Sequence, residues 1–482
     1  MEKAIESVKN IFKIPDLRNR IFFTFGILAL YRLGCHVLVP GINKDEFAKF
    51  LESLGGGILD MAIMFTGGAL SQAAVFSLGI MPYITASIIL QILQKSWPYL
   101  ERLSKEGEQG RNKINRYTRY LTVVFGLLQS FGVARTLIGL NASNPDMLTI
   151  QNSFQFYAVV MVTLTTGAVC IMWLGEKITE KGIGNGISLI IFASIVVGVP
   201  ASLKDLFQKV STHQVEAPVM ILTLLMIIAT IIFVVFFELG VRKIKIQYAK
   251  RATGSGQVAG GTSYLPFKVN SAGVIPVIFS GAVLQLPSLA RGLFVAAPGE
   301  TIPDWQSNYV LPLLDQLAYG RPLSQLIFLI ATMFFTFFYV DMLFNPKDTA
   351  ENLKKHGGFI PGIRPGKETQ AYIQGVLDRL TLWGGLYLTA VSIVPGWITS
   401  GFQLNALPGW LGGEFFERFL PSILNSGTNV GLAVALGGTS LLIVISVGLD
   451  FVNQVENQLI MRKYDGFTSG SKKAIMRTRR YG

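Results

Sequence analysis

The sequence is poor in the residues that build metal sites and disulfide frameworks, with 2 cysteines and 3 histidines among 482 residues. His36, His213 and His356 are far apart and have no cysteine or carboxylate neighbours at the spacing of zinc ligands. Cys35 and Cys170 lie in apolar segments, where a small packing residue is typical. We therefore expect no metal site, no disulfide framework and no cofactor.

The sequence also lacks a phosphate-binding loop of the Gly-x-x-x-x-Gly-Lys-Ser/Thr type, so we do not expect ATP hydrolysis. Residues 182–186, Gly-Ile-Gly-Asn-Gly, superficially resemble a dinucleotide fingerprint, but they precede an apolar segment and follow no strand. No cleavable signal peptide is evident at the N-terminus. The sequence predicts a protein that is not an enzyme, in which any directed transport draws its energy from a partner or a gradient.

Charge is scarce as well, at 15% of residues, whereas 50% are hydrophobic and the mean hydropathy is +0.47. One soluble core cannot bury that much apolar surface, and a membrane helix needs about 20 mostly apolar residues. The expected fold class is an all-α polytopic membrane protein with ten transmembrane helices. These spans are expected at residues 20–40, 73–93, 120–139, 154–175, 184–200, 217–238, 270–290, 323–344, 377–398 and 430–451.

Most of the 42 Lys and Arg residues fall on one side of these spans. The positive-inside rule then predicts that both termini are cytoplasmic. Three charged loops, at residues 94–119, 239–269 and 345–376, lie on this side, and the last two are longer than a connection needs. We expect them to fix the orientation and also to offer docking surfaces.

The spans divide into two halves of five, which places the second half in inverted orientation. The expected organisation is an amphipathic N-terminal segment at 1–19, an N-terminal half at 20–200, a C-terminal half at 201–451 and a basic tail at 452–482. The long outer segment 399–429 gives no indication of its role.

An ion-coupled transporter would need charged residues near the middle of its spans. The acidic residues instead lie at span ends, at Glu238, Asp341, Asp378 and Asp450. Only Arg32 and Arg135 lie deeper, and a lone arginine in the outer half of a span can snorkel to the interface. A secondary transporter for small solutes remains an alternative, as does a membrane assembly scaffold without conduction.

Residues 78–91 form an apolar stretch without charge, predicted to be helical. Ile80 and Ile84 are four residues apart and share one face of that helix, so they could line a constriction. Glycines flank a short apolar segment between the first two spans, which makes it free to pivot.

Ordered motifs run through the whole chain, at residues 64–71, 79–84, 106–111, 173–188, 268–276, 345–366, 379–382 and 437–443. On these motifs the sequence resembles the SecY/Sec61α family, and its bacterial members in particular. The resemblance implies two pseudo-symmetric halves around an hourglass pore with a short plug helix. It also implies a channel that passes unfolded polypeptide across the membrane and releases membrane segments to lipid through a lateral gate.

In that family, bulky aliphatic residues from four spans form a ring at the waist of the pore. The resemblance places this ring at Ile80, Ile84, Ile187, Ile191, Ile278 and Ile443. An apolar constriction can dewet and block ions when it is empty. Because it offers no directional hydrogen bonds, it would let any unfolded chain slide through.

The resemblance also implies a plug and a gate. The plug falls at about residues 57–70, with Ile58, Leu59, Met61, Ile63, Met64, Phe65, Gly67 and Gly68. The lateral gate lies between the second and seventh spans, with Thr85, Ser87, Gln91 and Ser280. Such polar residues usually serve helix packing, and here hydrogen bonds of about 1 kcal/mol each would close the gate.

The resemblance implies docking on the two longest charged loops, through Lys250, Arg251, Lys354, Lys355 and Arg364. The implied partners are SecE, SecG, the SecA motor ATPase, signal-bearing polypeptides, membrane lipids and the ribosome, whose RNA phosphates would attract these basic residues. The implied location is the bacterial inner membrane.

Overall fold

The computed structural model describes residues 14–47, 66–141, 146–150, 152–213, 217–248, 251–253, 256–258, 261–294, 310–317, 321–400 and 438–478. The chain forms two compact units. The first comprises Met1–Gly55, Ala62–Gly198 and Val447–Gly482, and the second comprises Gly56–Met61 and Val199–Ser446. Residues 1–13 of the expected N-terminal segment and all of 401–437 lie outside the described residues.

A helix overlaps each expected span. These helices are α2 (Pro15–Gly34), α5 (Met81–Ser96), α7 (Glu108–Asn141), α8 (Ser153–Lys181), α9 (Gly186–Ser211), α10 (Ala217–Leu239), α11 (Ile275–Phe294), α13 (Pro322–Leu343), α15 (Lys367–Ser400) and α19 (Gly438–Thr478). In the part of the chain that the structure describes, six helical segments are long and apolar enough to cross a membrane. Ile275–Leu284 of α11 is a shorter apolar helix.

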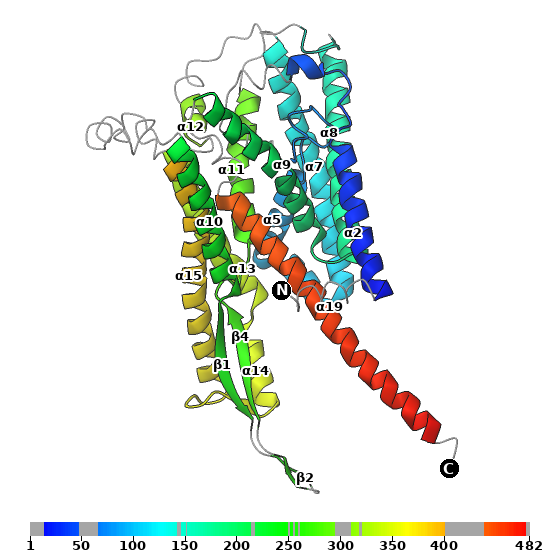
Figure 1. Cartoon of the computed structure of the whole chain (residues 1–482), viewed down its shortest axis with the longest axis vertical. Coiled ribbons are helices and arrows are strands. Elements are labelled where there is room, and N and C mark those ends of the chain that lie inside the picture. The colour runs from blue at the N-terminus through cyan, green and yellow to red at the C-terminus, as the bar shows by residue number, and fades with distance from the viewer. Residues whose placement is uncertain are drawn as a thin grey trace, which may run out of the picture. The chain divides into compact units, whose positions relative to one another are not determined.

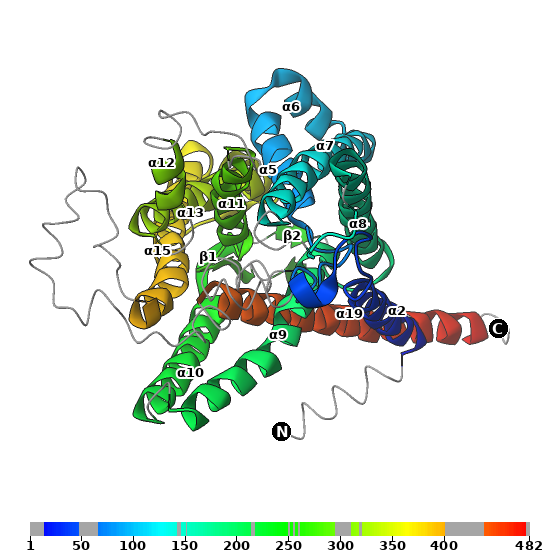
Figure 2. The same ribbon diagram turned by 90° about the horizontal axis from the view of Figure 1, so that it is seen from above.

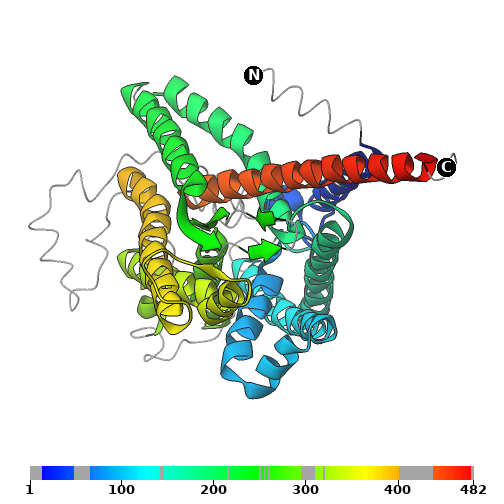
Figure 3. The ribbon, with the colours of Figure 1, turned by 90° about the horizontal axis from the view of Figure 1, so that it is seen from below.

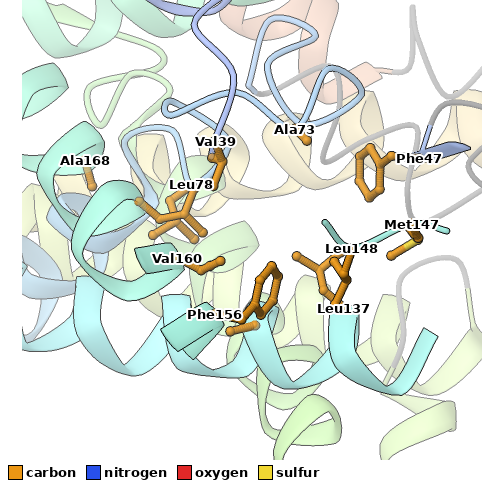
Figure 4. Close-up of a cluster of buried hydrophobic side chains, with 12 residues drawn as sticks. Val39, Phe47, Ala73, Leu78, Leu137, Met147, Leu148, Phe156, Val160 and Ala168 are labelled. Carbon is orange, nitrogen blue, oxygen red and sulfur yellow. The ribbon is translucent and has the colours of Figure 1, made fainter. Parts of the chain in front are cut away.

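The first unit packs around α7 and α8, which lie side by side (Figures 2 and 3). Ser130 Oγ of α7 is 3.3 Å from Thr165 Oγ1 of α8, and Arg119 forms a 2.8 Å ion pair with Glu176. The core of this unit brings Phe156, Val160 and Leu137 of α7 and α8 together with Val39, Phe47, Ala73 and Leu78 (Figure 4). A short helix, α6 (Pro98–Lys105), precedes α7.

The prediction that helix extends from residue 73, or from residue 78, was wrong for the residues before Met81. Residues 66–80 form a series of turns, and Gly67, Gly68 and Gly79 have φ angles of +64°, +80° and +56°. Side chains rarely tolerate this left-handed region, and it cannot continue an α-helix. The helix α5 begins after Ile80, with Pro82 in its first turn, where the missing N–H costs nothing.

The second unit contains α10, α11, α13, α15, the short α12 (Leu311–Gln316) and a β-sheet that the sequence analysis missed. Strands β1 (Val241–Tyr248) and β4 (Thr262–Lys268) pair antiparallel, with Val241 opposite Lys268. They continue beyond the end of α10, beside α14 (Pro346–Lys355), as Figure 1 shows. Strand β5 (Gly358–Phe359) adds to the other edge of β1, and β2 (Arg251–Thr253) pairs with β3 (Gly256–Val258).

The outer face of α10 indicates contact with lipid. Exposed apolar residues recur at helical spacing along it, at Ile221, Leu225, Ile228, Ile232 and Phe236. A stripe of this length without charge has no reason to face water. The hydropathy of the sequence and the exposed face of the helix therefore agree.

Candidate functional site

The first unit holds four of the six ring residues. Ile80 precedes α5, and its carbonyl accepts a 3.1 Å hydrogen bond from the backbone N–H of Ile84. The two residues are therefore one helical turn apart, and both are buried, at 6% and 4% exposure. On α9, Ile187 and Ile191 are also one turn apart, and Ile191 is buried.

Close packing fixes the start of α9. Asn185 Oδ1 accepts a 3.1 Å hydrogen bond from the N–H of Ile187, which caps the helix. A Cβ at Gly186 would lie 1.9 Å from the carbonyl oxygen of Gly175 on α8, so only glycine fits at this crossing. The crossing holds Ile187 against Gly175, since a Cβ there would be 3.2 Å from Ile187 Cγ1.

The second unit holds the other two ring residues. Ile278 is half-buried in the first turn of α11, where its N–H donates to Val274 O at 3.3 Å. Ile443 is buried on α19. Each of the six isoleucines thus lies on one of the expected helices or at its first turn, and the ring itself stays a prediction.

Most of the expected plug lies outside the described residues, namely Ile58, Leu59, Met61, Ile63, Met64 and Phe65. Its last residues are described. Gly67 and Gly68 adopt left-handed φ angles, and Leu70 N–H donates to Thr66 Oγ1 at 3.3 Å. The segment therefore ends in a glycine turn of the kind that a hinge needs.

Three side chains that the sequence analysis did not connect with the plug contact this turn. The Arg32 guanidinium of α2 donates to the carbonyl of Gly67. Tyr31 Oη lies 2.7 Å from Ser194 Oγ of α9 and 3.4 Å from Thr66 O. No sequence pattern could have found these contacts, because the acceptors include main-chain carbonyls 35 residues away.

The expected gate residues bond within their own helices. Thr85 Oγ1 donates to Met81 O at 3.0 Å and Ser280 Oγ to Pro276 O at 2.8 Å. Gln91 Nε2 donates to Ser87 Oγ at 2.9 Å. The other amide atom, Gln91 Oε1, is buried without a hydrogen-bond partner among the described residues. The role of these residues at a gate stays a prediction.

The two longest charged loops pack together in the second unit. We call them the hairpin platform, residues 241–268 and 345–366. Its core joins Ile244, Phe267 and Ile360 to the start of α15. The alternation of buried Ile244 and Ile246 with exposed residues along β1 is the sequence signal that could have predicted the hairpin.

The platform carries three of the expected docking residues on its surface. Lys354 and Lys355 are exposed on the last turn of α14, and Arg364 is exposed in the loop that follows β5. Thr369 Oγ1 donates to Arg364 O at 2.8 Å and holds that loop against α15. Lys250 lies outside the described residues, as does the side chain of Arg251 in β2.

A polar junction at the end of α10 also escaped the sequence analysis. Glu238 Oε1 accepts hydrogen bonds from Asn270 Nδ2 at 2.7 Å and from Ser446 Oγ at 3.0 Å. Asn270 precedes α11 and Ser446 lies on α19, so one carboxylate ties three helices of the second unit together. Within the described residues, no group of three or more His, Cys, Asp or Glu side chains is placed to hold a metal ion.

The sequence matches the SecY family over residues 74–452. The chain belongs to the SecY family. It is 42% identical over 452 residues to the protein translocase subunit SecY of Pseudomonas aeruginosa, covering 94% of this chain and 93% of the relative. It is 40% identical over 464 residues to the SecY subunit of Escherichia coli K12, covering 96% of each chain.

Solved structures share the SecY fold at lower identity. The first, described as the structure of a protein conducting channel, has a TM-score of 0.57 at 16% identity. A second, at a TM-score of 0.54 and 17% identity, is described as showing that the SecY plug domain stabilises the closed state and maintains a membrane seal. A third, at a TM-score of 0.54 and 15% identity, is Sec61 in a canine ribosome-channel complex from the endoplasmic reticulum. Each match covers 91% of this chain and 91% of the other.

Membership of the SecY family decides between the alternatives. The protein is a multi-pass membrane protein with the all-α fold of the protein-conducting channel. It is a SecY subunit of a protein translocase, conducts polypeptides across the membrane and is not an enzyme. The secondary-transporter and scaffold interpretations are therefore set aside.

Proposed function

We propose that polypeptides cross at a constriction lined by the six isoleucines and that the segment at about 57–70 plugs the channel at rest. The observation that carries this proposal is the spacing of Ile80 with Ile84 and of Ile187 with Ile191, each pair one helical turn apart within one packed unit. Apolar side chains at a narrow point exclude ions without binding a particular peptide sequence.

The closed state depends on the plug in this proposal. The structural relative whose plug domain is described as maintaining a membrane seal supports it. The glycine turn at Gly67 and Gly68 supplies the hinge, since both residues already occupy φ angles that favour glycine.

Membrane segments leave sideways in this proposal, between α5 and α11, which carry Thr85, Ser87, Gln91 and Ser280. The side-chain hydrogen bonds of Thr85, Gln91 and Ser280 stay within their own helices. An apolar signal helix can therefore enter between α5 and α11 without breaking them, and its burial shifts the gate towards its open form.

The hairpin platform is the proposed docking surface for the SecA motor ATPase and for the ribosome. Exposed Lys354, Lys355 and Arg364 would attract acidic protein surfaces and RNA phosphates, and such binding weakens as salt rises. The structural relative in the ribosome-channel complex supports the ribosome as a partner. SecE, SecG and signal-bearing polypeptides complete the proposed partners, and the proposed location is the bacterial inner membrane with both termini cytoplasmic.

Deletion of residues 57–67 tests the plug. We expect intermittent opening of the resting channel in planar bilayers, with translocation retained, because the seal is lost but the path remains. An unchanged resting conductance would reject the sealing role. Complete loss of export in membrane vesicles would show that the segment is needed for the fold.

A further inference from the structure

We propose that Arg32, Tyr31 and Ser194 form a latch that holds the downstream end of the plug and sets how often the resting channel opens. This inference rests on the proposed plug function. All three residues belong to the first unit, as does the turn that they contact. They are positioning residues, which act through the plug.

Arg32 is the principal contact of the latch. An arginine in a membrane span is costly, so its presence calls for a partner. Its Nη1 donates to the carbonyl of Gly67, and the side chain is partly buried. A bond from a charged donor to a main-chain carbonyl is stronger than a neutral one, and it acts on the residue whose φ angle of +64° marks the hinge.

Tyr31 and Ser194 add a weaker contact. Ser194 Oγ donates to Ile190 O at 2.9 Å, and Tyr31 Oη is 2.7 Å from Ser194 Oγ and 3.4 Å from Thr66 O. The two hydroxyl groups therefore have two protons for three contacts. The contact between Tyr31 Oη and Thr66 O is the longest of the three. The Tyr31 ring stacks on Phe76 at a centroid distance of 5.8 Å, which fixes its position.

The residues that follow the hinge are held firmly to the rest of the first unit. Val39 N–H donates to Ala73 O at 2.9 Å and Val75 N–H to Val37 O at 2.8 Å, so a β-bridge joins this segment to the chain after α2. A Cβ at Gly67 would lie 3.2 Å from Ser194 Cα, so the hinge also packs directly on α9. The latch therefore lies at the boundary between the anchored turns and the plug residues that precede Thr66.

The test compares Arg32→Met, which keeps the length of the side chain and removes its donors, with Arg32→Lys, which keeps a charged donor. Each is measured as resting conductance of the assembled channel in planar bilayers. We expect Arg32→Met to raise the frequency of opening by about tenfold, as the loss of one charge-assisted hydrogen bond implies. Arg32→Lys should restore part of the seal, and Arg116→Met, at an exposed position of α7, is the control that should change nothing.

The same substitution in the 57–67 deletion separates the latch from the plug. Because Gly67 is absent there, Arg32→Met should add no further opening. If the deletion itself leaves the conductance unchanged, the proposed plug function fails. The latch is wrong if the deletion opens the channel but Arg32→Met in the full chain does not. It is also wrong if Arg32→Met raises the opening frequency of the deletion variant further.

A second variant covers the case in which Arg32→Met does not assemble. Tyr31→Phe with Ser194→Ala removes two hydroxyls and keeps the stacking on Phe76. We expect more frequent opening, smaller than for Arg32→Met, and again none beyond that of the deletion. An unchanged opening frequency in this double variant would overturn the latch.

Discussion

At the scale of single residues, the proposed seal depends on the side chains that line the predicted constriction. Ile80, Ile84 and Ile191 are buried apolar side chains, and none offers a hydrogen bond to water. A narrow apolar passage tends to empty of water, and an ion then has no hydration shell to keep. The resting barrier to ions should therefore fall when hydroxyls replace these methyl groups.

Replacing both Ile84 and Ile187 with serine tests this barrier. We expect a clear rise in resting ion conductance in planar bilayers, because the added hydroxyls hydrate the constriction. The matched control is Ile221→Ser with Ile232→Ser, the same change at two exposed positions of α10. Equal conductance in the wild type and the Ile84/Ile187 variant would reject the role of these residues in blocking ion flow.

Single residues also show where sequence reasoning ends. The spacing of the isoleucines is a local pattern. Ile187 and Ile191 lie one turn apart on α9, whereas Ile80 precedes α5 and is joined to Ile84 by a backbone hydrogen bond. No sequence pattern indicated the acceptor of Arg32, which is the Gly67 carbonyl 35 residues away. Glu238 was placed correctly at the end of a span, but its bonds to Asn270 and Ser446 depend on tertiary packing.

At the scale of secondary-structure elements, glycine decides how closely helices approach. Gly186→Ala would bring a Cβ to 1.9 Å from the Gly175 carbonyl oxygen, so α8 and α9 would have to separate. Overpacking of this kind typically costs about 1–3 kcal/mol. We expect a lower midpoint of thermal unfolding for the protein in detergent.

Gly375→Ala on α15 is the control for Gly186→Ala, since nothing lies within 4 Å of a Cβ there. Alanine is the better helix former, so this variant should unfold at the same or a slightly higher temperature. If both variants unfold alike, the tight crossing of α8 and α9 is not what limits stability.

The hairpin platform is the element that the sequence analysis described least well. Hydropathy marks loops 239–269 and 345–376 as polar, and their length alone suggested docking. Strand β1 pairs with β4, which is close in the sequence, but the addition of β5 depends on pairing between segments about 110 residues apart, such as Gln247 with Phe359. The local signals were present all the same, in the alternation of β1 and in Asn345, whose side chain caps α14.

Arg364→Glu tests docking on this platform. Arg364 is exposed and only its main chain is held by Thr369 and Glu368, so reversing its charge should leave the fold intact. We expect a marked loss of SecA-driven export in membrane vesicles, with normal insertion of the protein itself, because like charges would repel the motor. Lys204→Glu, the same reversal at an exposed site on α9, is the control, and normal export in Arg364→Glu would count against the docking assignment.

At the scale of the whole molecule, hydropathy predicted an all-α membrane fold because a lipid environment demands long apolar segments, and six helices among the described residues are long and apolar enough to cross a membrane. It misplaced the start of α5, where Gly79 and Pro82 override the apolar run. The chain forms two units. It passes from one unit to the other near Gly198, within α9, and again near Ser446, within α19. The expected pseudo-symmetry of the halves stays a prediction.

The central claim is that a translocating polypeptide passes Ile191. The most direct measurement places a photoreactive residue at position 191 and stalls a radiolabelled secretory precursor in membranes that contain the partner proteins. We expect a crosslink between position 191 and the precursor that depends on the signal sequence of the precursor. Absence of that crosslink, while control positions along the chain still label, would contradict a conducting path at the six isoleucines.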